Sequence, residues 1–119
     1  MLLEESRALG FYNSNLLIGV TWGLWHAPII LMGHNYPEYP VIGVGMMVVF
    51  CVMLAFPFAY VRFKTNSILG PCVMHGMING LAAMTLYFTW GGHSLVTGLT
   101  GVAGFITISI VLYDAFSRA

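Results

Sequence analysis

The side chains of this sequence that could do chemistry lie inside its most apolar segments. They are two histidines and one asparagine, His26, His75 and Asn79. Hydrocarbon makes ionisable and strongly polar side chains costly, so those that persist in it are candidates for a functional site. An imidazole can bind a metal, position water or carry a proton, and a carboxamide can donate hydrogen bonds to developing negative charge. The pattern predicts a polar site within an apolar protein.

The composition indicates the class of protein. The chain has 119 residues, of which 59% are hydrophobic and 7% are charged, with four basic and four acidic side chains. An ordinary soluble domain carries about 25% charged residues, and so few polar groups could not cover the surface of a small soluble domain. The zero net charge argues against nucleic-acid binding, which needs clustered Lys and Arg. The composition therefore favours an integral membrane protein, and membrane lipid is an expected partner.

The charged residues are spaced like the ends of membrane crossings. Long stretches without charge separate Arg7 from Glu38, Glu38 from Arg62, and Lys64 from Asp114. A helix needs about 20 apolar residues to cross about 30 Å of hydrocarbon. The sequence thus predicts an all-α fold: one membrane domain over residues 1–119, a helical bundle with about four transmembrane helices. We place the crossings near residues 16–32, 41–61, 67–90 and 95–113.

The basic residues predict the orientation of this bundle. With four crossings, the N-terminus, the loop after the second crossing and the C-terminus lie on one side of the membrane. All four basic residues, Arg7, Arg62, Lys64 and Arg118, lie on that side. Because basic residues are enriched in cytoplasmic segments, we expect both ends of the chain to be cytoplasmic.

The three polar residues are predicted to share one layer of the membrane. His75 and Asn79 are four residues apart, which places both on one face of a helix. His26 lies about 15 Å, and His75 about 12 Å, from the cytoplasmic start of its crossing. The two crossings run in the same direction, so we expect the three side chains to converge on one polar pocket.

Pairs of glycines lie close in sequence to the three polar residues. The pairs Gly19 and Gly23 on the first crossing, and Gly76 and Gly80 on the third, have the spacing that lets helix backbones approach closely in lipid. Both pairs are expected to help close the pocket.

Four further side chains are weighed beside the polar site. Trp22 and Trp25 lie too deep to be interface anchors, so we expect them to line a cavity or to pack. His34 and His93 fall in predicted loops on the far side of the membrane, where solvated side chains are expected. Other interpretations of His26 and His75 also stay open, because a bundle histidine often serves as a structural hydrogen-bonding group and two such histidines could be axial haem ligands.

The motifs resemble those of a known family. Trp22-xxx-His26 followed by His75-xxx-Asn79, each in an apolar helix, resembles the second and third motifs of the CAAX-protease and bacteriocin-processing intramembrane peptidases, the CPBP or Abi family. The resemblance covers about residues 9–83. The strings of residues 22–28 and 33–37 look like those of prokaryotic members, so a prokaryotic cell membrane is expected.

The first motif of the family does not match in the same way. It consists of two adjacent glutamates and an arginine four residues after the second, whereas here Glu4-Glu5 is followed by Arg7, and Leu9 stands at the arginine position. The family also usually has Phe where Trp22 stands. The chain therefore resembles the C-terminal part of a longer family domain. We expect Glu4 and Glu5 on a solvated turn, and their use in place of the first motif stays open.

The resemblance implies an intramembrane endopeptidase that hydrolyses a peptide bond in a membrane-associated or lipidated protein. His26 and His75 would orient the attacking water or bind zinc or another divalent metal, and Asn79 would donate to the tetrahedral intermediate. A first-motif glutamate would be the general base. Its absence implies weak or no activity and leaves open a non-catalytic membrane subunit or scaffold. The oligomeric state and the substrate are not predicted.

Overall fold

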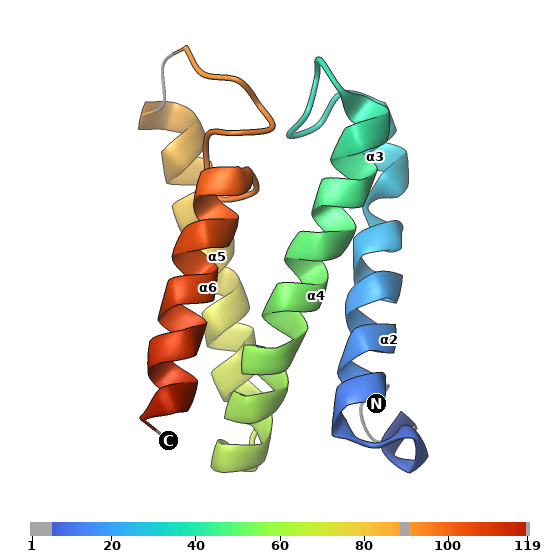
Figure 1. The fold of residues 1–119 in the computed structure, drawn as a ribbon, viewed down its shortest axis with the longest axis vertical. Helices are drawn as coiled ribbons and strands as arrows, with labels where there is room; N and C mark the ends of the chain where they lie inside the picture. The colour runs from blue at the N-terminus through green and yellow to red at the C-terminus, as the bar shows by residue number, and fades with distance from the viewer. Residues whose placement is uncertain (1–5, 89–90, 119) are drawn as a thin grey trace.

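The computed structural model describes residues 6–88 and 91–118, and all regular structure in these residues is helical. The described residues form a short 3-10 helix, η1, and five α-helices. Figure 1 shows α2, α4, α5 and α6 running along the long axis of the molecule, with the first and last described residues at the same end. The elements are η1 (Ser6–Leu9), α2 (Phe11–Trp25), α3 (Ala27–Leu31), α4 (Pro40–Thr65), α5 (Leu69–Phe88) and α6 (Val102–Ser117).

The long helices have the length and apolarity of membrane crossings. Among the described residues, two helical stretches pass this test, Gly10–Leu31 and Pro40–Thr65, and α6 is a shorter apolar helix. The 26 residues of α4 span about 39 Å at the rise of an α-helix, more than the hydrocarbon thickness of a bilayer. The predicted fold class, an all-α membrane bundle, is confirmed.

The helix of the first crossing is interrupted at His26. α2 ends at Trp25 and α3 begins at Ala27, with His26 between them in a tight turn whose backbone N–H donates to the Gly23 carbonyl at 3.1 Å. Pro28 follows in the first turn of α3. Because proline has no N–H to donate, it cannot continue the hydrogen-bond ladder of α2.

The fourth crossing differs from the prediction at its start. It was expected to begin at Leu95, but α6 begins at Val102, and residues 91–101 form turns. Gly98 adopts a φ of 85°, which a right-handed helix does not contain. The helix therefore starts only after this glycine. The predicted end of the third crossing, Trp90, lies outside the described residues.

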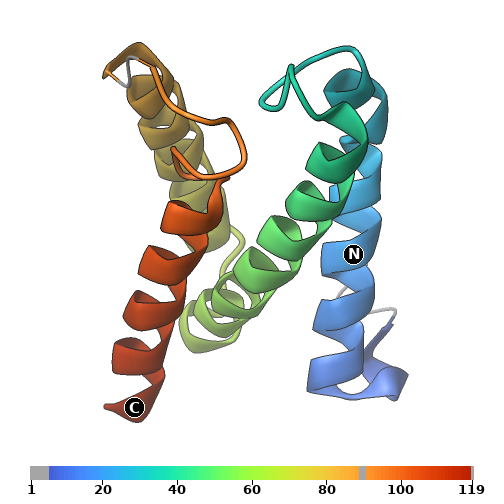
Figure 2. The ribbon, with the colours of Figure 1, turned by 45° about the horizontal axis from the view of Figure 1, so that its top comes forward.

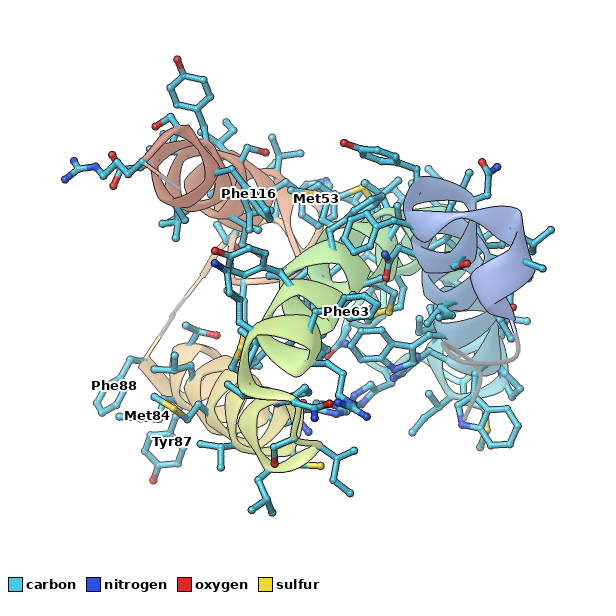
Figure 3. The ribbon with its side chains drawn as sticks, turned by 90° about the horizontal axis from the view of Figure 1, so that it is seen from below. Met53, Phe63, Met84, Tyr87, Phe88 and Phe116 are labelled. Atoms are coloured by element: carbon cyan, nitrogen blue, oxygen red, sulfur yellow. The ribbon has the colours of Figure 1, made fainter. Side chains whose placement is uncertain are left out.

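α4 is the central helix of the bundle. It contacts α2, α3, α5 and α6, and Figure 3, a view from below, shows it between α2 on one side and α5 and α6 on the other. The buried hydrophobic cluster takes most of its residues from α4. Its members are Ile30, Tyr36, Met47, Phe50, Cys51 and Leu54.

The closest contact in the bundle joins α2 to α4. A Cβ atom on Gly19 would lie 2.5 Å from the Val52 Cα, and one on Gly23 would lie 2.4 Å from the Val48 Cα. These distances leave no room for a side chain, so the two backbones touch. The predicted role of this glycine pair in close packing is confirmed.

The second glycine pair behaves differently. A Cβ atom built on Gly76 or Gly80 meets no other atom within 4 Å in the described part of the chain. Both glycines are exposed on α5. The expectation that this pair closes the polar pocket is wrong, because α5 turns a different face toward its neighbours.

The two connections at the far end of the bundle both lie at the top of Figure 2, and a hydrogen bond joins them. Tyr36, in the α3–α4 loop, is fully buried and donates from its hydroxyl to the Thr100 carbonyl at 2.5 Å. Burial raises the pKa of the Tyr36 phenol, so it remains a donor at neutral pH. Beside it, the rings of Tyr39 and His93 stack at 4.9 Å.

We expect the Gly23→Ala variant to lower the free energy of unfolding by about 1–3 kcal/mol, because the added methyl overpacks the contact with Val48. Unfolding in detergent, followed by circular dichroism, measures this change. The matched control is Gly45→Ala on α4, where the Cβ atom meets open space. Because alanine has a better helix propensity than glycine, this control should raise the free energy of unfolding by up to about 1 kcal/mol. Equal stability of Gly23→Ala and wild type would contradict the close contact.

Candidate functional site

His26 is held by a hydrogen bond that fixes its ring. Its Nδ1–H donates to the Trp22 carbonyl one turn earlier, at 2.8 Å. A carbonyl oxygen can only accept, so Nδ1 must carry the proton. In the neutral ring this leaves the lone pair on Nε2, the nitrogen that points away from its own helix turn. His26 is only half-buried, and Nε2 is therefore the atom with which this residue can act on water or a metal.

His75 approaches from a different helix. It lies on the face of α5 that is turned toward the bundle and is also half-buried. The centre of its ring is 5.3 Å from that of Trp22 on α2, in an edge-on arrangement, and 5.9 Å from that of Phe58 on α4. Three helices therefore meet at this ring.

Trp22 links the two histidines. Its ring centre is 6.2 Å from that of His26 and 5.7 Å from that of Phe58. We call Trp22, His26, Phe58 and His75 the histidine–aromatic cluster. The structure thus brings the imidazoles of His26 and His75 to the same indole, in agreement with the shared layer predicted for them. The expectation that Trp22 packs rather than anchors at the interface is met as well.

Asn79 does not join this cluster. Asn79 lies one turn beyond His75 on α5, and it is exposed. Trp25 is 82% exposed, so the expectation that it packs or lines a cavity is wrong. The reason is helical geometry, since Trp25 lies about 100° around the axis from His26 and faces away from α4.

Phe58 was not singled out from the sequence. An aromatic residue in an apolar crossing is ordinary, and only the packing of α4 against α2 and α5 shows that this one borders both Trp22 and His75. No residue near Phe58 in the sequence, including Pro57, signals this contact.

The cluster contains two side chains, His26 and His75, of a type that can bind a metal. Within residues 6–88 and 91–118, no group of three or more His, Cys, Asp or Glu could hold a metal ion. Catalytic zinc usually takes three protein ligands, so His26 and His75 alone do not complete such a site. Glu4 and Glu5 lie outside the described residues. The arrangement offers two imidazoles beside apolar walls, which suits the positioning of water or of a metal completed by a further ligand.

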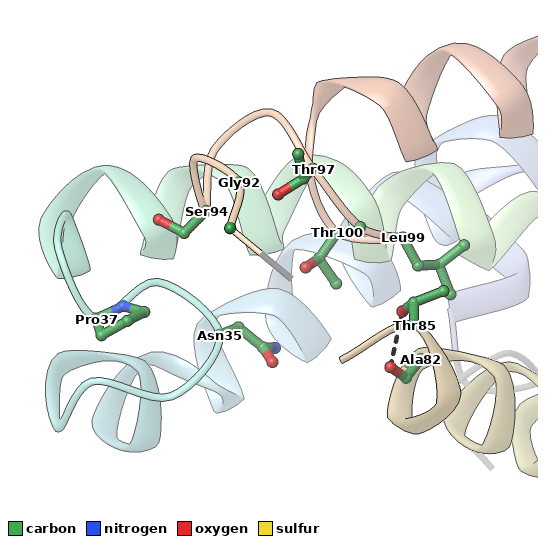
Figure 4. Close-up of a pocket in the computed structure, with 11 residues that line it drawn as sticks. Asn35, Pro37, Ala82, Thr85, Gly92, Ser94, Thr97, Leu99 and Thr100 are labelled. Atoms are coloured by element: carbon green, nitrogen blue, oxygen red, sulfur yellow. Dashed lines mark hydrogen bonds between the residues drawn. The ribbon is translucent and has the colours of Figure 1, made fainter. Parts of the chain in front are cut away.

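A separate cavity, lined in part by polar side chains, lies near the end of the bundle. It has a volume of about 300 Å³, and Figure 4 shows Asn35, Ser94 and Thr97 among the residues that line it. The Ser94 hydroxyl is buried there without a hydrogen-bond partner in the described part of the chain. None of His26, His75 and Asn79 lines this cavity. Ala82, which does, is about 10 Å beyond His75 along α5.

Comparison with known proteins places these residues in a family. The type II CAAX prenyl endopeptidase Rce1-like family matches residues 1–81, a range that contains His26, His75 and Asn79 and ends within α5. No curated protein and no solved structure matches the chain. The match covers more than half of the sequence and agrees with the resemblance of the motifs. The chain belongs to the type II CAAX prenyl endopeptidase Rce1-like family.

Proposed function

We propose that this protein contributes to an intramembrane endopeptidase of the CAAX-prenyl-protease type, which hydrolyses a peptide bond in a membrane-associated or lipidated protein. The observation that carries the proposal is the meeting of His26 and His75 at Trp22, within the range that the family matches. We further propose a prokaryotic cell membrane with both chain ends on the cytoplasmic side, as the distribution of basic residues favours.

In the proposed mechanism, the two imidazoles orient the attacking water. The Nδ1 hydrogen bond to the Trp22 carbonyl holds the His26 ring in place and leaves Nε2 to accept a hydrogen bond from that water. Trp22 and Phe58 form apolar walls beside the two histidines. Because these walls lower the local dielectric, they strengthen the hydrogen bonds between the imidazoles and the water. The positioning of one water beside a bound peptide is the contribution of these side chains to the rate.

Asn79 is proposed to stabilise the oxyanion of the tetrahedral intermediate. Its exposed carboxamide is free to donate to a peptide that binds along α5. Such a donor acts mainly in the transition state, where the negative charge develops.

The general base is proposed to come from outside the described residues. If a divalent metal is bound, His26 and His75 are its proposed ligands, and the third ligand must also come from elsewhere.

The tautomer of His26 can be measured directly. At about pH 8, where a free imidazole is neutral, ¹⁵N-histidine NMR should show His26 with a protonated Nδ1 and an unprotonated Nε2. The exposed His34 is the control and should show a mixture of tautomers. A His26 resonance with the proton on Nε2 would contradict the proposed orientation.

Replacement of the histidines tests the catalytic role. His26→Ala and His75→Ala should each lower kcat/KM for cleavage of a farnesylated peptide in lipid vesicles by about 100-fold or more. His34→Ala, which removes an exposed loop histidine, should leave the rate unchanged. Alanine variants as active as wild type would overturn the proposal and indicate a non-catalytic membrane subunit.

Replacement of Asn79 separates transition-state stabilisation from binding. Asn79→Ala should reduce kcat by about 100-fold with little change in KM, because the lost donor acts mainly on the oxyanion. Met77→Ala, at another exposed position on α5, is the matched control and should retain wild-type kinetics. A higher KM with an unchanged kcat would instead assign Asn79 to substrate binding.

A further inference from the structure

An apolar groove of about 400 Å³ separates parts of α4 and α6. No member of the histidine–aromatic cluster lines it, so it is distinct from the candidate catalytic site. Its two polar side groups are hydroxyls, and that of Thr107 already donates to the Ala103 carbonyl at 2.9 Å. The groove therefore presents hydrocarbon to whatever enters it. Lining residues include Leu54, Pro57, Tyr60, Ile108, Ala115 and Phe116.

Two aromatic contacts between α4 and α6 flank the groove. Phe50 and Phe105 stack at 6.2 Å toward one end, and Tyr60 and Phe116 meet edge-on at 5.2 Å toward the other. Both helices run in the same direction (Figure 1), so these pairs hold them apart along the stretch between. Figure 3 shows Phe116 on the side of α6 that faces α4.

The Tyr60 end of the groove carries a positive charge. The Lys64 ammonium lies 5.6 Å from the centre of the Tyr60 ring and has no carboxylate partner in the described part of the chain. Among the described residues, the carboxylate at this end is that of Asp114, which Arg118 already pairs at 2.8 Å. Glu38 lies in the α3–α4 loop, at the other end of α4. An apolar groove thus opens toward an ammonium group beside an aromatic ring.

We propose that this groove binds one acyl chain of an anionic membrane phospholipid, with the headgroup phosphate at Lys64. The hydrocarbon lining suits the acyl chain, and the ammonium suits a phosphate without a compensating positive charge on the lipid. Tyr60 has an apolar ring for the chain and a hydroxyl for the headgroup region, a combination common at membrane interfaces. The site goes beyond the proposed peptidase function, because it uses other side chains, which come from α4, from α6 and, with Met74, from α5.

Lipid selectivity tests this proposal. The purified protein in detergent is titrated with dioctanoyl phosphatidylglycerol or dioctanoyl phosphatidylcholine, and bound lipid is counted by native mass spectrometry. Wild type should prefer the anionic lipid by about fivefold, the effect expected of one basic residue at a membrane surface. Lys64→Gln should abolish the preference, whereas Lys64→Arg should retain it.

Filling the groove tests where the chain binds. Ala115→Phe places a ring in the groove and should reduce binding of both lipids. Ala103→Phe is the matched control, since this exposed residue lies on α6 but does not line the groove, and it should bind like wild type. Circular dichroism verifies that each variant keeps its helices, and Lys64→Gln provides a surface variant that leaves the interior packing intact.

Three results of the lipid-binding experiments would overturn the proposal. They are equal binding of the two lipids by wild type, an anionic preference that survives in Lys64→Gln, and identical lipid binding by Ala115→Phe and Ala103→Phe. A dimer that Ala115→Phe dissociates would also overturn it, because a second copy of the chain would then cover the groove.

Discussion

The backbone contact between α2 and α4 is the constraint on which the rest of the structure depends. In lipid, helices do not associate through a hydrophobic driving force, so close packing of small residues has to hold them together. Gly19 and Gly23 meet the backbone of α4 at Val52 and Val48. This contact fixes the rotation of α2 about its axis and so directs Trp22 toward α4 and α5.

α4 carries two separate surfaces as a consequence of its central position. Phe58 contacts both Trp22 and His75, so one surface of the helix supports the candidate catalytic site. Leu54 and Tyr60 face α6 and line the apolar groove. A helix that packs on four others must divide its circumference among them, and here the division separates a polar site from a site for hydrocarbon.

Much of the architecture follows from charge spacing and helical periodicity, and the exceptions have local causes. The all-α membrane bundle and the joint placement of His26 and His75 could be predicted because apolar stretches and helical rise set length and depth. The start of α6 could not, because the φ of Gly98 ends the helical pattern in a stretch that remains apolar. Nor could the outward position of Asn79 on α5, which depends on how that helix is rotated against α4.

The central claim is that His26 and His75, from different helices, share one indole. Proton NMR of protein that is protonated only at histidine and tryptophan rings measures this directly, with the Trp22 signals assigned through a Trp22→Phe variant. Cross-peaks from the Trp22 ring to both imidazole rings are the predicted result, since the ring centres lie 6.2 and 5.3 Å apart. Cross-peaks to His26 alone, with none to His75, would contradict the convergence of the two helices and with it the proposed site.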